Sequence, residues 1–349
     1  MKDAGHRSCV EAALNHEKTE RTPVNNFVLA TAAHSAGISV EAARWDPKIS
    51  AKVAVDHAMK TKSDFVKPVL DSQVLFVDLG MEVRFPENDY GQIVKPLAED
   101  AESIDKLALF DANIASECPK FHASIISALE ETARIIPEDL HICGLSWGPI
   151  TTAGYIMGVE NMVMGILMEP ETVHKLIGKV TKMVSTTETR MMDAGATLMW
   201  MADPTSSEDL ISPDMFGEFS KPYIKQVVAD VNAHDKDAPT FVHICGNTLK
   251  ILKQMPETKA DCLSFDHAVD PGKAKETAGR KISIMGNVDP VQVMMMGTPE
   301  TVTKACYDVI DAAGQESGFI LAPGCETPIS TCDENILAMG EAARTYWTR

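Results

Sequence analysis

The sequence predicts a (β/α)8 TIM barrel of the α/β class, with a helical extension at the N-terminus and an inserted hairpin. Short apolar runs alternate about eight times with longer amphipathic stretches, the pattern of strand followed by helix. The apolar runs are nearly continuous, as expected for parallel strands that are covered on both faces. The 349 residues show no composition break, so we expect residues 1–349 to form a single catalytic barrel domain.

Eight segments rich in Val, Ile, Leu and Phe are the expected strands. In chain order they are Thr22–Phe27, Asp64–Pro68, His141–Trp147, Ala196–Ala202, Thr240–Cys245, Cys262–Asp266, Ile282–Val288 and Gly318–Pro323. Amphipathic helices are expected between these strands. The clearest of them are Pro170–Asp193, Pro213–Asn232, Thr248–Gln254 and Pro299–Ala313.

The repeat is least regular between Asp71 and Ile136. Two short extended segments there, Met81–Pro86 and Gln92–Pro96, indicate a hairpin, and extra helices are expected around it. An open doubly wound sheet is the alternative that the pattern leaves open. No G-x-G-x-x-G loop follows any expected strand, so the sequence does not predict a dinucleotide site.

Composition and charge exclude several classes of function. Lys and Arg number 32 against 50 Asp and Glu, a formal net charge of −18, which argues against nucleic acid or a membrane as partner. The most apolar stretch, Met162–Met168, is far shorter than the roughly 20 residues of a membrane span. No secretory signal is visible, so the 8 cysteines are expected as reduced cytoplasmic thiols or metal ligands.

Three metal-binding side chains fall at the ends of the fifth and eighth expected strands. His243 and Cys245 are two positions apart on a strand, so their side chains share a face. Cys325 follows the eighth strand, at the same end of the barrel. One imidazole and two thiolates with an open fourth position are typical of catalytic zinc. A buried cysteine is more often a small hydrophobic residue, and the third donor is what favours a metal site.

Acidic residues at other strand ends are weaker candidates. Asp266 could orient His243, occupy the open metal position or take a proton, and helix capping is the alternative. Asp203, Asp289 and Asp71 share this ambiguity. The remaining cysteines are expected to be core or surface thiols without an assigned role: Cys9, Cys118, Cys143, Cys262, Cys306 and Cys332.

The chain resembles the uroporphyrinogen decarboxylase superfamily over nearly its full length. The matching segments are Arg21-Thr-Pro-Val24, Leu79-Gly-Met-Glu-Val83, Gly148-Pro-Ile-Thr151, Gly286-Asn-Val-Asp-Pro290 and Pro323-Gly-Cys325. The resemblance implies a (β/α)8 barrel. The decarboxylases carry an arginine-rich segment after the first strand, which grips substrate carboxylates, and a catalytic aspartate that aligns with Asp71. Residues 25–37 hold no arginine here, so decarboxylation is a poor fit.

His243, Cys245 and Cys325 are instead similar to the zinc ligands of the methyltransferase branch of this superfamily. That branch moves a methyl group between a corrinoid and a thiol, and the resemblance is to the methylcobalamin:coenzyme M methyltransferases of methanogens. The methanol-specific type is expected, with the methylamine-specific type as the alternative. The resemblance implies one Zn²⁺ per chain, coenzyme M as acceptor, and a methylated corrinoid protein that docks at the barrel opening.

Further residues are expected around this site. Asn287 is expected to donate a hydrogen bond to the sulfonate of coenzyme M, because barrels often bind anions near the seventh and eighth strands. Asp71 is placed in the same binding site, and Asp266 among the catalytic residues. Another acceptor thiol, such as homocysteine, is an alternative. So is a non-enzymatic protein with a structural zinc, for which Cys332 would be the fourth ligand.

Overall fold

The fold is a curled sheet of parallel strands. The computed structural model describes residues 5–98, 100–107, 109, 117–137 and 139–348. Within these residues seven strands pair in the order β1-β4-β5-β6-β7-β8-β9, and every pairing is parallel. Their bounds are β1 Phe65–Val66, β4 His141–Trp147, β5 Leu198–Ala202, β6 Thr240–Ile244, β7 Cys262–Phe265, β8 Ser283–Val288 and β9 Phe319–Pro323.

The first expected strand closes the barrel through a single bridge. Val24 pairs in parallel with Leu321 of β9, and the Val24 carbonyl accepts the amide of Asp64, just ahead of β1, at 2.9 Å. The strand stays short because Pro23 has no N–H to donate and Phe27 turns into the left-handed region, with φ at 42°. The predicted (β/α)8 barrel is confirmed, with its first strand reduced to a few residues.

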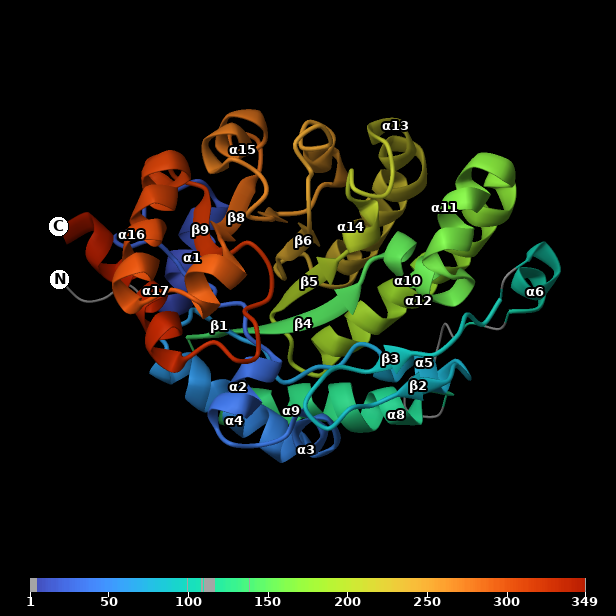
Figure 1. The fold of residues 1–349 in the computed structure, drawn as a ribbon, viewed down its shortest axis with the longest axis horizontal. Coiled ribbons are helices and arrows are strands. Elements are labelled where there is room, and N and C mark those ends of the chain that lie inside the picture. The colour runs from blue at the N-terminus through green and yellow to red at the C-terminus, as the bar shows by residue number, and fades with distance from the viewer. Residues whose placement is uncertain (1–4, 99, 108, 110–116, 138, 349) are drawn as a thin grey trace.

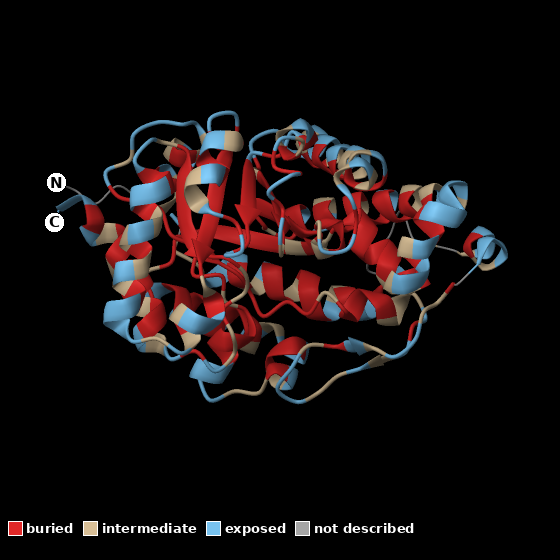
Figure 2. Cartoon of the chain, turned by 45° about the horizontal axis from the view of Figure 1, so that its top comes forward, coloured by how far each residue is buried: buried red, intermediate tan, exposed pale blue. Residues whose placement is uncertain are grey.

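The core has two layers, one on each side of the sheet. Residues that point into the barrel form one cluster with α1, whose Val10 and Ala13 plug one end. Its strand residues are Phe65, Cys143, Leu198, Trp200, Phe241, Cys262, Met285, Ile320 and Ala322. The alternate residues of the strands pack outward against the helices in a larger cluster. Figure 2 shows the consequence: the strands of the barrel are buried, and most of the helices that cover them are exposed on their outer faces.

Apart from α1, which covers one end of the barrel, the helices lie around the outside of the sheet (Figure 1). Those ahead of β4 are α1 His6–Leu14, α2 Ala30–Ser35, α3 Val40–Trp45, α4 Pro47–Lys60, α5 Val74–Asp78, α6 Ala101–Lys106, α8 Pro119–Phe121 and α9 Ser127–Ile135. Those after β4 are α10 Pro149–Met157, α11 Val159–Met168, α12 Pro170–Asp193, α13 Pro213–Met215, α14 Lys221–His234, α15 Pro271–Thr277, α16 Pro299–Val309 and α17 Asp333–Thr345. Among the described residues no single helix is long and apolar enough to cross a membrane; α10 and α11 together would be, but they are bent by 104°.

Three of the four clearest helix predictions are confirmed. α12 has the predicted bounds, and the other two helices contain π-helical turns, Phe216–Ser220 before α14 and Ile310–Gly314 after α16. The prediction of a helix over Thr248–Gln254 is wrong. That segment forms hydrogen-bonded turns, and the proline at position 256 lacks the amide needed to extend them into a helix.

The predicted hairpin is confirmed in shortened form. β2 Val83–Arg84 and β3 Gln92–Ile93 pair antiparallel and lie beside α5 (Figure 1). The hairpin belongs to the long connection between β1 and β4, on the side of the barrel where the strands end. We call this side the mouth.

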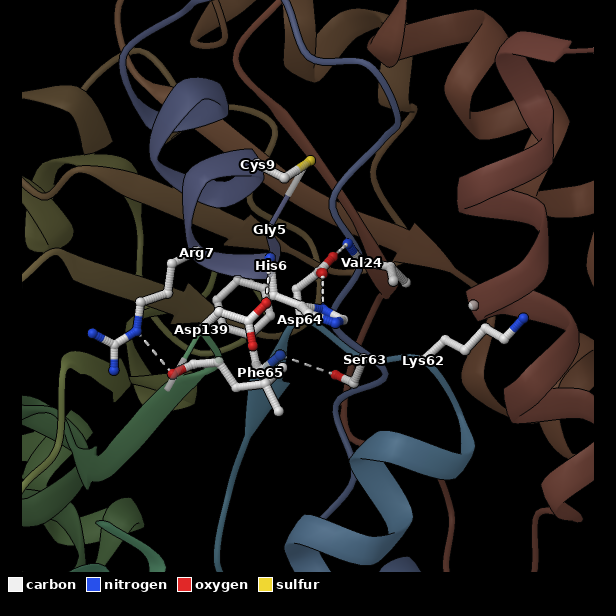
Figure 3. A network of polar contacts seen from close by, with 12 residues as sticks. Gly5, His6, Arg7, Cys9, Val24, Lys62, Ser63, Asp64, Phe65 and Asp139 are labelled. Atoms are coloured by element: carbon white, nitrogen blue, oxygen red, sulfur yellow. Dashed lines mark hydrogen bonds and ion pairs between the residues drawn. The ribbon is translucent and has the colours of Figure 1, made fainter. Parts of the chain in front are cut away.

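At the opposite end, a buried ion pair joins the first segment of the chain to β1 (Figure 3). Asp64 accepts two hydrogen bonds from the Arg21 guanidinium, at 2.8 and 2.6 Å, and a third from the Val24 amide at 2.7 Å. His6 Nδ1 of α1 lies 2.6 Å from the same carboxylate. Burial alone would raise the pKa of Asp64, but the bonds from His6, Arg21 and Val24 outweigh it and hold the pKa below its usual value.

Candidate metal centre

Three side chains that could bind a metal ion converge at the mouth. His243 is the fourth residue of β6, Cys245 follows that strand, and Cys325 comes two residues after β9. His243 Nε2 lies 2.9 Å from Cys245 Sγ, which lies 3.4 Å from Cys325 Sγ. The ligand atoms of all three lie within 4.8 Å of one another, and no other His, Cys, Asp or Glu group in the described residues meets this condition. The donors therefore lie close enough for one ion to bind all three.

Barrel curvature and two glycines bring these residues together. β6 and β9 are separated by two strands in the sheet order, and their ends face each other only because the sheet closes. Gly246 has φ at 73° directly after Cys245, a conformation that favours glycine. At Gly324 a Cβ atom would come within 2.3 Å of the His267 amide nitrogen. The absence of a side chain there lets the Cys325 turn pack closely against the end of β7.

The imidazole of His243 is hydrogen-bonded through one ring nitrogen, and its other nitrogen faces the thiols. Its Nδ1 lies 2.9 Å from Ser264 Oγ on β7, which leaves Nε2 for the two sulfur atoms. The rings of Phe27 and Trp200 pack against the imidazole at 5.5 and 6.1 Å. A histidine whose second nitrogen is fixed by a hydrogen bond is the usual arrangement of a metal ligand in proteins.

The two thiols lie within hydrogen-bonding distance of each other, and their pKa values are shifted in opposite directions. The hydrogen bond from Cys245 lowers the pKa of Cys325 to about 4, against the effect of burial and with help from His243. The same hydrogen bond, together with burial, raises the pKa of Cys245. Two thiols beside an imidazole nitrogen form a site that a divalent cation fits, because the cation stabilises both thiolates, whereas the hydrogen bond between the thiols stabilises only one.

A cavity of about 90 Å³ opens onto the three candidate ligands. Its lining residues are Phe27, Leu29, Ser72, Leu145, Ser146, Trp147, Ala202, His243, Cys245, Cys325 and Glu326. Neither Lys nor Arg is among them. The walls are therefore mostly apolar, and the candidate ligands lie at one side of the cavity.

The backbone of Phe27, one of the wall residues, is strained and is held by two hydrogen bonds. The Asn25 side chain accepts the Phe27 amide at 3.0 Å, and the amide of Thr327 donates to the Phe27 carbonyl at 2.9 Å.

Sequence reasoning missed Glu326, which lines the cavity next to Cys325. Glu326 is half-buried, and its carboxyl accepts a hydrogen bond from the Tyr90 hydroxyl, which itself accepts the Ala30 amide at 3.0 Å. Burial raises the pKa of Glu326 to about 7. The position beside a predicted ligand was the available signal, but nothing in the sequence placed Tyr90 or Ala30 next to it.

Asp266 and Asn287 lie near the mouth and bond the protein itself. Asp266 Oδ1 accepts the Ala268 amide at 3.0 Å and lies 2.7 Å from His267 Nδ1. It is not part of the group of three ligands. The Asn287 amide donates to the carbonyls of Asp266 and Val269 at 3.0 and 2.6 Å. Both side chains hold the loop after β7, and their roles toward a substrate stay predictions.

The other acidic candidates are also bonded within the fold. Asp71 is fully buried, and its Oδ2 accepts Arg44 Nε at 2.7 Å and the Gly91 amide at 2.8 Å. It is not among the residues that line the cavity, although its neighbour Ser72 is. Asp203 accepts the amide of Thr151 in the first turn of α10 at 2.8 Å. For Asp71, as for Asp266 and Asn287, a place in a substrate site remains a prediction.

The remaining cysteines lie outside the centre. Cys332 is exposed at the start of α17. The others are buried, as expected of core thiols: Cys9, Cys118, Cys143, Cys262 and Cys306.

Replacing Ser264 with alanine tests how the His243 ring is held. We expect zinc affinity to fall about 10- to 100-fold, because the ring loses the partner that fixes its orientation. Competition with a chromophoric chelator measures the affinity. Ser283→Ala is the matched control, since this buried serine on the next strand bonds the Ala13 carbonyl at the far end of the barrel. Equal affinities in both variants would show that Ser264 does not position the ligand.

Comparison with known proteins identifies the family. The family model described as uroporphyrinogen decarboxylase (URO-D) matches residues 6–346. The chain belongs to the uroporphyrinogen decarboxylase family. Members with two named activities resemble it at similar levels, so membership alone does not choose between them.

Both methyltransferases and decarboxylases are among the proteins similar to this URO-D family member. A methylated-thiol–coenzyme M methyltransferase of Methanosarcina mazei is 27% identical over 305 residues, 86% of this chain and 78% of the relative. A methylcobamide:CoM methyltransferase, MtbA, of Methanosarcina acetivorans is 28% identical over 254 residues, 73% and 71% of the two chains. A uroporphyrinogen decarboxylase of Hordeum vulgare is 29% identical over 215 residues, 60% and 63% of the two chains.

Solved structures support the fold of this URO-D family member. A methyltransferase from Methanosarcina mazei superposes with a TM-score of 0.87 at 22% identity, over 98% of this chain and 99% of that one. A B12-independent methionine synthase from Shewanella has a TM-score of 0.58 at 12% identity, over 86% and 89% of the two chains. At these identities the likeness concerns the barrel, and the choice between activities falls to the site.

Proposed function

We propose that this chain is a zinc-dependent methyltransferase that transfers a methyl group from a methylated Co(III) corrinoid to the thiol of coenzyme M. The observation that carries the proposal is the group of His243, Cys245 and Cys325, three ligands on one side of a cavity. Residues 1–349 would form one catalytic domain, working in the cytoplasm with a corrinoid protein that docks at the mouth. Methanol as the source of the methyl group is our expectation, and a methylamine pathway is the alternative.

The donor set matches zinc better than harder cations. One nitrogen and two sulfur atoms suit a borderline-soft ion, and three protein ligands leave a fourth position for substrate. When bound, zinc would supply the Lewis acidity that lowers the pKa of the acceptor thiol. Ser264 and the aromatic rings keep His243 in place, and the two cysteines contribute the negative charge that balances the ion.

The cavity provides the place where acceptor and donor meet. In the transfer, the acceptor sulfur forms a bond to the methyl carbon while the carbon–cobalt bond breaks, and its electron pair stays on cobalt as Co(I). The thiol proton leaves to solvent. The apolar walls formed by Phe27, Leu29 and Leu145 exclude water from the sulfur, and an in-line approach requires the corrin ring to cover the mouth.

Decarboxylation fits the same cavity poorly. A substrate with several carboxylates needs cationic partners, and neither Lys nor Arg is among the residues that line it. The chain from Asn25 to Gly37 contains no arginine, and the Asp71 carboxylate is engaged by Arg44. The two cysteine thiols and the His243 imidazole would have no role in a reaction that only removes carbon dioxide.

The same lack of cations favours a second candidate acceptor. The sulfonate of coenzyme M also needs donors, and the Asn287 amide expected to supply one is bonded to two backbone carbonyls. The amino-acid group of homocysteine is a zwitterion whose own ammonium balances its carboxylate, so it brings no net charge that a cationic side chain must match. Incubation with methylcobalamin and each thiol, followed by chromatography of the thioether product, separates the two acceptors.

X-ray absorption at the zinc edge, with and without coenzyme M, tests the proposal directly. We expect a shell of one nitrogen, two sulfurs and one light atom, with the light atom replaced by a third sulfur when the thiol is added. An unchanged shell that already holds four protein ligands would mean a structural zinc and would overturn the proposal. The exposed Cys332 is the thiol to replace in that case.

A further inference from the structure

A lysine is buried inside the barrel beneath the metal centre. Lys67 directly follows β1 and is 5% exposed. Its ammonium donates a hydrogen bond to Asn25 Oδ1 and lies 5.3 Å from the centre of the Phe27 ring and 4.9 Å from that of Trp200. A buried ammonium is unfavourable without compensating interactions. The transfer chemistry described above does not use it.

The same two rings link this ammonium to the metal ligands. Phe27 and Trp200 contact the His243 imidazole at 5.5 and 6.1 Å between ring centres. A single aromatic ring, that of Phe27 or of Trp200, therefore lies between the ammonium and the imidazole and contacts both. A ring face attracts a cation without neutralising it, so the charge still acts across this apolar layer.

The charge of the metal centre changes during the reaction. A divalent zinc with two thiolates and a neutral imidazole is uncharged as a unit. An acceptor thiolate adds one negative charge, in a cavity whose walls are mostly apolar. A charge that appears in such surroundings is unfavourable unless a fixed opposite charge lies nearby.

We propose that Lys67 is a positioning residue that supplies this fixed positive charge, so that the centre binds an anionic thiolate more strongly than a neutral ligand. The inference rests on the proposed zinc centre and adds to it a residue that sets the affinity for the acceptor. Burial lowers the pKa of Lys67 to about 8, which leaves the side chain mainly charged at neutral pH. The titratable groups that face it are Cys143 on β4 and Glu326 beside the cavity.

The test uses the full-length protein loaded with Co²⁺, whose absorption reports the ligands of the site. Coenzyme M is the anionic probe and imidazole the neutral one. A unit charge at roughly 10 Å, with an effective dielectric constant of about 20, changes a binding equilibrium on the order of tenfold. In Lys67→Met we expect coenzyme M to bind about tenfold more weakly and imidazole to bind as in the wild type.

Three further variants make the test specific. Lys67→Arg keeps the charge and should restore thiol binding, and Lys67→Gln replaces Lys67→Met if the latter does not fold. Lys275→Met is the control: this lysine is also buried but bonds the carbonyls of Gly279 and Ser317, away from the centre. We expect it to lower the melting temperature without changing either affinity.

Several outcomes would overturn the inference. Unchanged coenzyme M affinity in Lys67→Met, or an equal loss for imidazole, would show that the charge does not select the thiolate. Wild-type affinity in the double variant Lys67→Met/Glu326→Gln would show that Lys67 serves to neutralise Glu326. If the wild-type protein fails to bind Co²⁺ or Zn²⁺, the proposed function fails instead, and the two failures are thereby distinguished.

Discussion

Replacing Cys325 with alanine should remove zinc binding and thiol methylation together, while the barrel remains folded. The side chain lies past β9, in the mouth, beside the other two candidate ligands and outside the hydrophobic core clusters. Structural zinc sites with four ligands bind with about 10–16 kcal/mol, so one ligand is worth roughly 3 kcal/mol, or more than a hundredfold in affinity. Cys245→Ala should behave in the same way.

Metal content by atomic emission and thioether formation from methylcobalamin measure the two losses, and circular dichroism checks the fold. Cys332→Ala is the matched control, because this exposed thiol lies seven positions further along the chain and outside the group of three. It should keep both zinc and activity. Full activity in a zinc-free Cys325→Ala protein would refute the mechanism.

Replacing Asp64 with asparagine should cause the largest loss of stability. The carboxylate holds the Arg21 guanidinium, the Val24 amide and His6 of α1 at the closed end of the barrel. Removing one partner of a buried ion pair leaves the other charge uncompensated, which costs about 3–5 kcal/mol. Because the pair also ties the first strand segment to β1, we expect α1 and the Val24 segment to loosen first.

The loss of unfolding free energy in Asp64→Asn should become smaller at low pH. The pKa of Asp64 is lower in the folded protein than its ordinary value of 3.8. Its contribution to stability is therefore complete above about pH 4 and is lost as the pH falls through the folded pKa. The difference in unfolding free energy between the wild type and Asp64→Asn should shrink below that pH.

Urea unfolding at several pH values measures this difference. Asp56→Asn is the control, since this carboxylate pairs with Lys52 on the exposed surface of α4, where ion pairs contribute little. Its midpoint of unfolding should match that of the wild type. An equally small effect for Asp64→Asn would mean that the buried ion pair does not stabilise the barrel.

The barrel and the convergence of His243, Cys245 and Cys325 could be predicted because both depend on short-range features of the chain. The alternation of apolar and amphipathic segments predicted β4 and α12 with the bounds that the structure shows. The two-residue spacing of His243 and Cys245 placed both on one face of a strand. The end of the eighth apolar run, Gly318–Pro323, placed Cys325 at the same mouth. The wrong helix at Thr248–Gln254 was too short for its periodicity to be decisive.

What surrounds the ligands was decided only by tertiary structure. Lys67, Glu326 and Phe27 come from separate parts of the chain, and nothing local indicates that they meet around His243. Local pattern also could not show that the Asp71 carboxylate bonds Arg44, 27 positions earlier. Periodicity and strand ends are properties of neighbouring residues, whereas burial and charge pairing depend on which distant segments the closed barrel brings into contact.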